Sequence, residues 1–526
     1  MTAGIVTAVT VRPERPGSQV AGFGRLLYAE WTKFRTVRGW GMAMVIAALL
    51  TAAIGIWATS GYHGLPCGSM LANGPAVGQA CPAPPAGPGG EMVTDSFYFV
   101  RQQLPGNGTM TARVTALAGS ATPGIQGGTS ALQPWAKAGI IVKANLRLGS
   151  AYAAIMITGS HGVRMQDNYT RDIAGWPGPV SVAFPRWLRL VRSGDTLTGY
   201  DSADGTHWTR VGAARLAGLP STVQAGLFVT SPEAVTAENA GPTLASAVFD
   251  HVAVAGTRPG RGWTGDNFGA GGAYQSLRGG FSQTGGTFTV RGSGDIAPAV
   301  ANAGGSGRPA DHGVIGAFAG LIVVIVVIVV ATMFITTEYR RGLIRTTLAA
   351  TPRRGQVLAA KAAVIGAVAF AAGLAGSAIA VLLGAYMLRG SGFYVFPVGV
   401  LTELRVVAGT AAMFALAAVF ALALGTIMRH SAGPVTAVIA LLVVPYFFTG
   451  PLSVLPGAAG DWLLRVTPAA AFAVQQAMPA YPQVDSAYTP QYGYYPLSPL
   501  GGLAVLCAWA ALALALAALL LRRRDA

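Results

Sequence analysis

The stretch TTEYRRGLIRTTLAATPRRGQVLAAK (residues 336–361) decides the fold class, because it lies between two segments of hydrocarbon character. The 22 residues before it, 314–335, contain no charged side chain, and residues 362–388 after it contain none either. Six of the 26 residues in the stretch are Lys or Arg. A run of about 20 apolar residues crosses a bilayer core of ~30 Å as a helix. The stretch is therefore predicted to be a short polar loop between two membrane-spanning helices.

The whole chain has the composition of a membrane protein. Of its 526 residues 52% are hydrophobic and 11% are charged, and a mean hydropathy of +0.49 excludes a soluble multidomain protein. The first apolar segment follows about 40 mixed residues, which is typical of a retained signal anchor and not of a cleaved signal peptide. We predict six spans, at residues 40–59, 313–335, 362–388, 406–428, 432–449 and 500–521.

The distribution of basic residues predicts the orientation in the membrane. With a cytoplasmic N-terminus, residues 1–39, the loop 336–361, Arg429 and the tail 522–526 hold 16 Lys and Arg against four acids. This is the positive-inside asymmetry of a multi-pass protein with both termini in the cytoplasm. Of the 36 basic residues 32 are Arg, a bias typical of a GC-rich bacterial genome, so we expect the bacterial plasma membrane. Most other basic residues lie in the long segment 60–312, and a nucleic acid partner is not expected.

Residues 60–312 differ from the rest of the chain and predict an extracellular β domain. A Pro/Gly-rich linker, 66–90, contains Cys67 and Cys81. Such a pair is readily oxidised outside the cytoplasm, so we predict a disulfide between them. From residue 97 about nine short runs of β-branched and aromatic residues are separated by Gly, Asp, Asn and Pro. This spacing predicts an all-β, jelly-roll-like sandwich inserted into a polytopic α-helical membrane protein.

The β domain offers two kinds of candidate ligand site. Asp204 and Gly205 predict a hairpin turn, and calcium binding by Asp201 and Asp204 is the alternative. The second candidate site is a platform of tryptophan rings that would bind a glycan, although packing in the core is favoured for most of these rings. The candidate glycan contacts are Trp135, Trp176 and Trp208, with Trp187 as a further ring of the platform.

The sequence contains no motif for catalysis. No Gly-Lys pair exists, so the chain lacks a P-loop for ATP, and HExxH, CxxC and GxSxG are absent as well. The six histidines are scattered singly, so no metal site is expected. We expect a chain without catalytic residues and without a cofactor of its own.

Two amphipathic elements flank the predicted spans on the cytoplasmic side. Residues 22–40 carry an apolar stripe that includes Trp31, and the loop 336–361 carries apolar residues at i, i+4 spacing on a different face from Arg341 and Arg345. The pair Thr351-Pro352 predicts the start of the third membrane helix. The alternative is that the arginines only fix topology and contact anionic lipid head groups.

The order of these elements resembles the permease subunit of an ABC-2 type exporter. The resemblance rests on AEWTKFRT before the first span, on EYRRGLIRTTL between spans two and three and on RRR after the sixth, and it covers residues 22–59 and 313–526. It implies a separate cytoplasmic ATPase subunit that binds ATP and Mg, and a homodimer or a heterodimer with a second permease. It implies a connecting helix with Glu30, Trp31, Lys33 and Arg35. It also implies a coupling helix with Glu338, Tyr339, Arg340, Arg341, Arg345 and Thr346.

Two segments complete the comparison with that family. Residues 450–499 contain the run GDWLLRVTPAAAFAVQQAM, which is too short and too polar to span the membrane. It matches the helical hairpin that the family places between spans five and six on the outer face. The insert of about 250 residues is a departure. It resembles concanavalin A-like or laminin G-like sandwiches of secreted carbohydrate-active enzymes, with one strand in a circularly permuted position, and implies an extracellular glycan.

Two other function classes stay open at this point. The first is a membrane-anchored carbohydrate-binding or sensing protein whose spans only display the sandwich. The second is a glycosidase, which needs two carboxylates about 5 to 10 Å apart in a cleft. Small residues and prolines inside the spans favour a packed helical bundle and hence the exporter. Drug, lipid, peptide and polysaccharide exporters share these helices, so the cargo is open.

Overall fold

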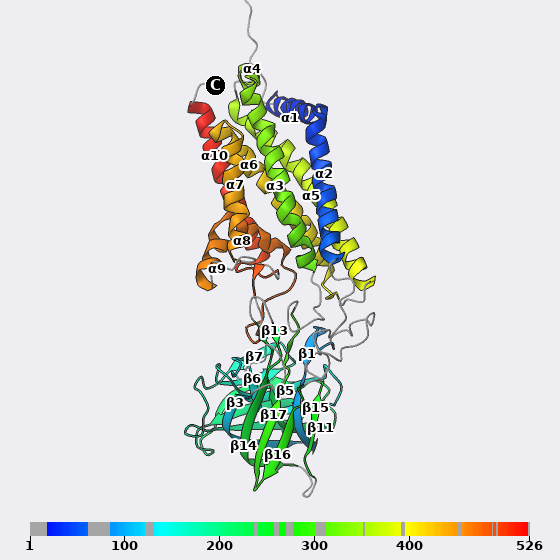
Figure 1. Cartoon of the computed structure of the whole chain (residues 1–526), viewed down its shortest axis with the longest axis vertical. Coiled ribbons are helices and arrows are strands. Elements are labelled where there is room, and N and C mark those ends of the chain that lie inside the picture. The colour runs from blue at the N-terminus through cyan, green and yellow to red at the C-terminus, as the bar shows by residue number, and fades with distance from the viewer. Residues whose placement is uncertain are drawn as a thin grey trace, which may run out of the picture.

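The computed structural model contains a helical bundle and a β domain at opposite ends of an elongated molecule (Figure 1). It describes residues 18–60, 85–120, 131–235, 240–256, 262–269, 277–300, 312–350, 353–390, 395–449, 455, 457–485, 488–490 and 493–523. The β domain is inserted between the second and third helices of the chain, so both of its connections lead back to the bundle.

Six helical segments among the described residues are long and apolar enough to cross a membrane, as predicted. The fifth consists of two short helices that follow each other closely. The helix that contains the second predicted span continues to Arg340, and the helix that contains the third begins earlier than predicted, at Arg354. Thr351 and Pro352 lie outside the described residues. The helices are α1 Ser18–Thr36, α2 Arg38–Ser60, α3 His312–Arg340, α4 Leu343–Ala350, α5 Arg354–Gly390, α6 Val400–Met428, α7 Ala432–Leu442, α8 Val444–Thr449, α9 Gly457–Val466, η2 Pro468–Gln475 and α10 Pro499–Arg523.

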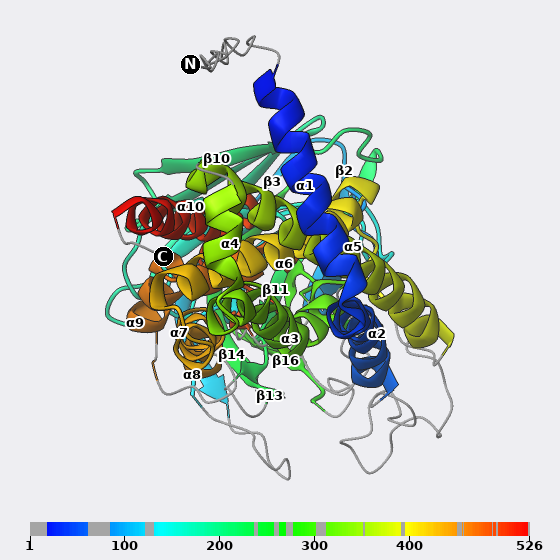
Figure 2. The same ribbon diagram turned by 90° about the horizontal axis from the view of Figure 1, so that it is seen from above.

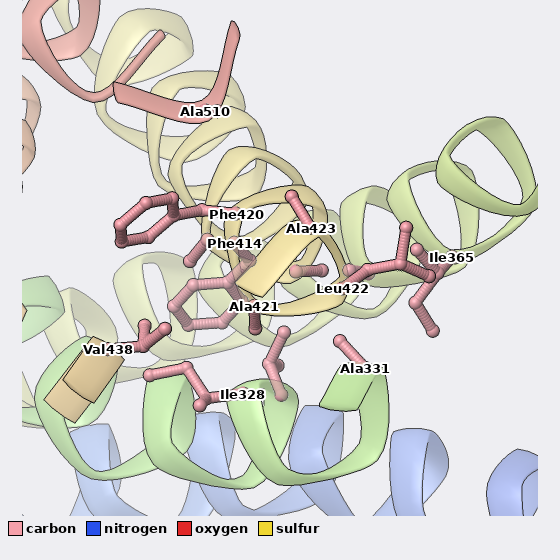
Figure 3. Close-up of a cluster of buried hydrophobic side chains, with 14 of the residues drawn as sticks. Ile328, Ala331, Ile365, Phe414, Phe420, Ala421, Leu422, Ala423, Val438 and Ala510 are labelled. Carbon is pink, nitrogen blue, oxygen red and sulfur yellow. The ribbon is translucent and has the colours of Figure 1, made fainter. Parts of the chain in front are cut away.

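The core of the bundle is apolar and built around α6. Side chains from α3, α5, α7 and α10 meet those of α6, among them the residues labelled in Figure 3. Several positions on α6 are Ala, and small residues let membrane helices approach closely. A Cβ on Gly373 of α5 would lie 2.9 Å from the Cα of Ala411, so the α5–α6 contact depends on that glycine.

The helix α1 lies across the end of the bundle beside α4, as the view from above shows (Figure 2). Its Phe34 is buried and contacts the rings of Trp40 and Phe334 with centroid distances of 6.2 and 5.9 Å. The amphipathic helix predicted before the first span is therefore present, and an aromatic contact joins it to α2 and α3. We call this the α4 end of the bundle.

The β domain contains two seven-stranded antiparallel sheets that enclose an apolar core. Sheet A has the strand order β10-β9-β8-β3-β14-β17-β16 and sheet B the order β15-β2-β11-β4-β5-β6-β7. A β sandwich of about nine short strands was predicted. The two sheets contain more strands than that, because short and edge strands carry little alternation. The strands are β2 Phe97–Pro105, β3 Gly108–Ser120, β4 Lys137–Lys143, β5 Tyr152–Thr158, β6 Val163–Asp167, β7 Arg171–Ala174, β8 Arg186–Ser193, β9 Thr196–Ser202, β10 Thr209–Arg215, β11 Thr222–Thr230, β14 Leu244–Ala255, β15 Thr264–Phe268, β16 Gly280–Thr284 and β17 Thr287–Gly292, with the short pair β12 Ala234–Val235 and β13 Ala240–Gly241.

A two-stranded ribbon joins the β domain to the bundle. It consists of β1 (Val93–Asp95) and β18 (Ile296–Pro298), the first and last strands of the insert, which pair antiparallel. Two fully buried lysines of β4 hold it on sheet B, since Lys143 Nζ lies 2.8 Å from Asp95 Oδ2 and Lys137 Nζ contacts Asp295 Oδ1 at 2.5 Å. The two connections to the membrane part thus leave the sandwich side by side.

The ribbon and sheet B also contact the segment between η2 and α10. Ala297 and Val300 pack in one apolar cluster with Val484 and Tyr494. The side chain of Gln483 donates a hydrogen bond of 3.2 Å to the carbonyl of Thr170. We call this contact region the joint, and it seats the sandwich on the end of the bundle opposite α4 (Figure 1).

Candidate functional site

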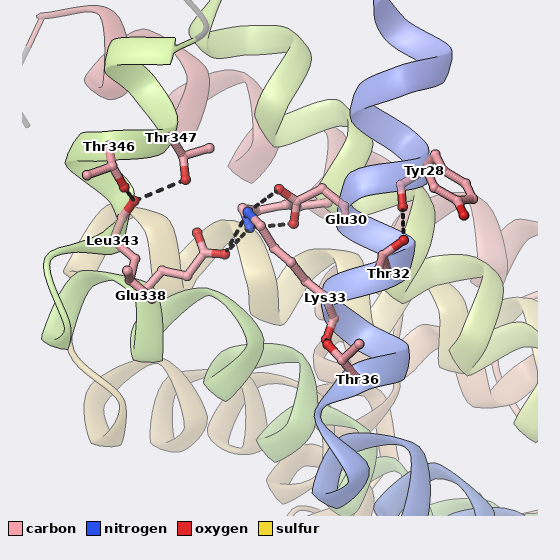
Figure 4. A network of polar contacts seen from close by, with 10 residues as sticks. Tyr28, Glu30, Thr32, Lys33, Thr36, Glu338, Leu343, Thr346 and Thr347 are labelled. Atoms are coloured by element: carbon pink, nitrogen blue, oxygen red, sulfur yellow. Dashed lines mark hydrogen bonds and ion pairs between the residues drawn. The ribbon is translucent and has the colours of Figure 1, made fainter.

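Four charged residues meet where α1 crosses α3 and α5, at the α4 end (Figure 4). Lys361 Nζ lies 2.7 Å from Glu30 Oε2 and 2.6 Å from Glu338 Oε1. Lys33 Nζ lies 2.8 Å from Glu30 Oε1 and 3.4 Å from Glu338 Oε1. We call these four residues the ion cluster. It contains two acids and two bases, so its charges balance.

The ion cluster is shielded from solvent except at Lys33. The side chains of Lys361 and Glu30 are 1% and 2% exposed, whereas that of Lys33 is 40% exposed. Burial acts to lower the pKa of Lys33, but its hydrogen bond to Glu30 and the charges of Glu338 and Glu30 outweigh that effect and raise it. A buried charge that loses its partner costs several kcal/mol, about 3 to 5 in measured cases. The three helices are therefore held in one arrangement at this point.

Helical spacing explains how α1 contributes to the ion cluster. Glu30, Lys33 and Phe34 follow at i, i+3 and i+4, so they share the face of α1 that covers the bundle. Phe334 precedes Glu338 by four residues on α3, and its ring lies 5.0 Å from Lys361 Nζ. Trp31 lies on another side of α1 and is 43% exposed.

The residues expected to contact an ATPase subunit do not form one continuous surface. Glu30 and Glu338 point into the ion cluster and are buried. Tyr339 is half-buried with the guanidinium of Arg429 5.5 Å from its ring. Exposed are Trp31, Arg35, Arg340, Arg341 and Thr346, and Lys33 is partly so. Arg345 belongs to α4, but its side chain is outside what the structure describes.

Lys361 is not among the site residues predicted from the sequence. It is the last residue of the basic stretch 336–361. One signal was available, because a lysine between Ala359-Ala360 and Ala362-Ala363 stands alone in an apolar helix. Such a charge inside a membrane helix has a partner as a rule.

The tryptophans chosen as glycan contacts lie against three different arginines. Trp135 is 4% exposed and stacks on His161 with ring centroids 4.0 Å apart, while Arg164 lies 5.5 Å from its centroid. Arg186 lies 4.3 Å from the ring of Trp176, and Arg189 lies 3.7 Å from that of Trp208. Trp135 thus has little surface for a ligand, and Trp176 and Trp208 are half-buried.

The remaining candidate sites have local explanations or fall outside the described residues. Asp201 is buried and paired with Arg186, and Asp204 accepts hydrogen bonds from the backbone of Thr206 and His207 in the predicted turn. Within the described ranges no three His, Cys, Asp or Glu side chains gather as a metal site. The predicted disulfide partners, Cys67 and Cys81, lie outside the described residues.

Comparison with known proteins gives only weak structural matches. No family model and no curated protein matches the chain. A functionally unknown protein from Saccharomyces cerevisiae is 18% identical over 31% of this chain and 77% of its own, with a TM-score of 0.21. The GH43 protein BlXynB from Bacillus licheniformis is 14% identical over 30% of this chain and 33% of its own (TM-score 0.20). Scytalido-glutamic peptidase is 10% identical over 39% of this chain and 100% of its own (TM-score 0.24). These low TM-scores carry no argument about function.

Proposed function

We propose that this chain is the permease subunit of an ABC-2 type exporter, which moves a substrate out of a bacterial cell with ATP hydrolysed by a separate cytoplasmic ATPase subunit. The observation that carries the proposal is the ion cluster. It links α1, the end of α3 and the beginning of α5, which are the segments that the resemblance to ABC-2 permeases assigns to the connecting helix and the coupling loop. A push on α1 or on the end of α3 is passed into the bundle because buried charges resist separation.

In this proposal the chain does no covalent chemistry of its own. The ATPase subunit holds ATP and Mg and docks on the exposed residues of α1 and of the α3–α4 turn, foremost Arg340 and Arg341. Two permease copies, or this chain and a second permease, form the transport path. Alternating access then needs only a bundle with two packed states that the motor biases by differential contacts.

The orientation follows the same proposal. Both termini and the α4 end lie in the cytoplasm, and the sandwich, of concanavalin A-like or laminin G-like type, lies outside the plasma membrane. The segment with α9 and η2 is the family's hairpin between spans five and six. The joint between that hairpin and the ribbon supports this placement, because it seats the sandwich on the end of the bundle away from α4.

The test is copurification from native membranes in mild detergent, with mass spectrometry of whatever binds the tagged chain. We expect a stoichiometric P-loop ATPase with the wild type and its loss with Arg340→Glu/Arg341→Glu, since reversal of two exposed charges opposes docking. Arg389→Glu is the matched control, because Arg389 is exposed at the other end of α5. A membrane-inserted wild type that brings down no ATPase would overturn the proposal, and retention by the double variant would remove the α3–α4 turn from the docking surface.

A further inference from the structure

The solvent face of sheet A carries side chains that the proposed function does not use. Along β8 and β9, Leu188, Leu190 and Leu197 point into the sandwich core, so the residues between them point outward. Sheet B lies on the far side of that core and is the sheet that the ribbon covers. The outward face of sheet A is therefore turned away from the ribbon and stays uncovered while the sandwich is seated on the bundle (Figure 1).

The strand register aligns cationic and aromatic side chains in one row of this face. Arg210 of β10 is directly opposite Tyr200 of β9, which is opposite Arg189 of β8, which is opposite Thr111 of β3. Neighbouring strands lie about 4.8 Å apart, so the backbones that carry the two arginines are about 10 Å apart with an aromatic ring between them. The adjacent row contributes Trp187.

One of these side chains, that of Arg189, is held in place before any ligand arrives. The guanidinium of Arg189 lies 3.7 Å from the ring centroid of Trp208, and its Nε donates a hydrogen bond of 3.2 Å to Thr111 Oγ1. A stacked guanidinium keeps donors for an anion and loses less rotamer entropy when it binds one. Arg210 is exposed and extends the row toward the sheet edge.

The face has a surplus of positive charge. Five of the twelve arginines in the described part of the β domain form an ion pair with an acid, as Arg113 does with Asp250 on this same face. Arg189, Arg210 and Arg215 take part in none of the ion pairs formed within the described part of the chain. They lie on β8 and β10, at the same end of sheet A. A ligand for this surface must therefore supply negative charge.

We propose that the row Arg210–Tyr200–Arg189, with Trp208 and Trp187 beside it, binds an anionic polysaccharide. The aromatic ring offers a flat apolar surface for a sugar ring, and the flanking guanidinium groups form charge-assisted hydrogen bonds with carboxylate or phosphate groups on its neighbours. A neutral glycan would leave the arginines without partners. The site differs from the three tryptophans chosen from the sequence, of which it keeps Trp208. It does not depend on the exporter proposal.

The test measures binding of polygalacturonate to the full chain in nanodiscs, with neutral dextran of equal length as the reference probe. We expect saturable binding of polygalacturonate only, weakened by added salt. Arg189→Gln/Arg210→Gln should weaken it at least about tenfold, since each replacement removes a charge-assisted hydrogen bond to the anion. Arg210→Gln alone should weaken it about threefold or more; its side chain is exposed, so folding is not at risk.

Arg291→Gln is the matched control, because Arg291 is exposed on β17 of the same sheet but far from the row, and it should change the affinity less than about twofold. Equal binding of dextran, or unchanged affinity in the double variant, would overturn the proposal. Tighter binding of duplex DNA or of phosphatidylglycerol vesicles that the double variant also loses would replace the polysaccharide by another polyanion. None of these results depends on an ATPase subunit, so they are separable from the copurification test.

Discussion

At the scale of single residues, the charge balance of the ion cluster governs the α4 end of the bundle. Lys361 serves two carboxylates at once, and Lys33 touches the same two from the solvent side. The two lysines therefore differ in what their removal leaves behind. Without Lys361, the buried acids keep only a half-exposed partner, while without Lys33 they keep the buried one.

Lys361→Met is expected to destabilise the protein by about 3 kcal/mol, because it strands buried carboxylates, whereas Lys33→Met should cost about 1 kcal/mol or less. The measurement is thermal unfolding of the purified chain in detergent. Neutral replacement of the buried set, Lys361→Met/Glu30→Gln/Glu338→Gln, should recover most of the loss, since no unpaired charge is then buried. If the triple variant melts no higher than Lys361→Met, the contact is one of shape and not of charge.

At the scale of elements, close helix packing depends on a few glycines. A Cβ on Gly502 of α10 would lie 2.0 Å from the carbonyl oxygen of Ala470 in η2. A Cβ on Gly41 of α2 would meet nothing within 4 Å. Both residues lie in helices, so their helix propensities are matched and only the surroundings differ.

Gly502→Ala should lower stability by about 1 to 3 kcal/mol, because α10 must move away from η2 to admit the methyl group. Gly41→Ala should leave stability unchanged or raise it by up to about 1 kcal/mol. Melting temperatures of the two variants decide the question. Equal melting temperatures for both would show that η2 yields without cost.

At the scale of the whole molecule, the joint contains a titratable group that faces both parts. Asp485 accepts a hydrogen bond from the backbone N–H of Trp135 at 3.4 Å. Burial, followed by the charge of Asp295, raises the pKa of Asp485 above its usual 3.8, while the N–H of Trp135, Lys137 and His161 act in the opposite sense. An acid with a raised pKa in the folded state favours folding at a pH below its unfolded pKa, and that contribution is lost as pH rises through the folded pKa.

Asp485→Asn should therefore melt higher than the wild type by about 2 °C at pH 8, and the difference should shrink as pH falls toward 4. The amide oxygen keeps the bond from Trp135 without the charge. The readout is the difference in melting temperature between the full-length variant and the wild type across that pH range. Asp461→Asn is the control, since Asp461 is exposed on α9, and it should show no such trend. A difference that grows on acidification would contradict the assigned direction.

The fold class follows from local composition and pattern. Runs of about 20 apolar residues must span or be buried, and short β-branched runs between turn residues must pair, whatever lies elsewhere in the chain. The six helical segments and the two antiparallel sheets were accordingly predictable. The amphipathic helix before the first span was as well, because a 3.6-residue period is a local property.

The tertiary structure decided which charged groups meet. Glu30 and Lys361 are 331 residues apart, and Lys137 and Asp295 are 158 apart, so no local pattern marks them as partners. No local pattern predicts that the side chains of Glu30 and Glu338 point into the bundle. The contacts of the joint and the row Arg210–Tyr200–Arg189 on sheet A are likewise not marked by any local pattern. The sequence by itself determined which segments are apolar and with what period. Only helix packing and strand register determined which polar side chains face each other. The physical reason is that a buried charge needs a partner, and that partner can lie on any element that the fold places beside it.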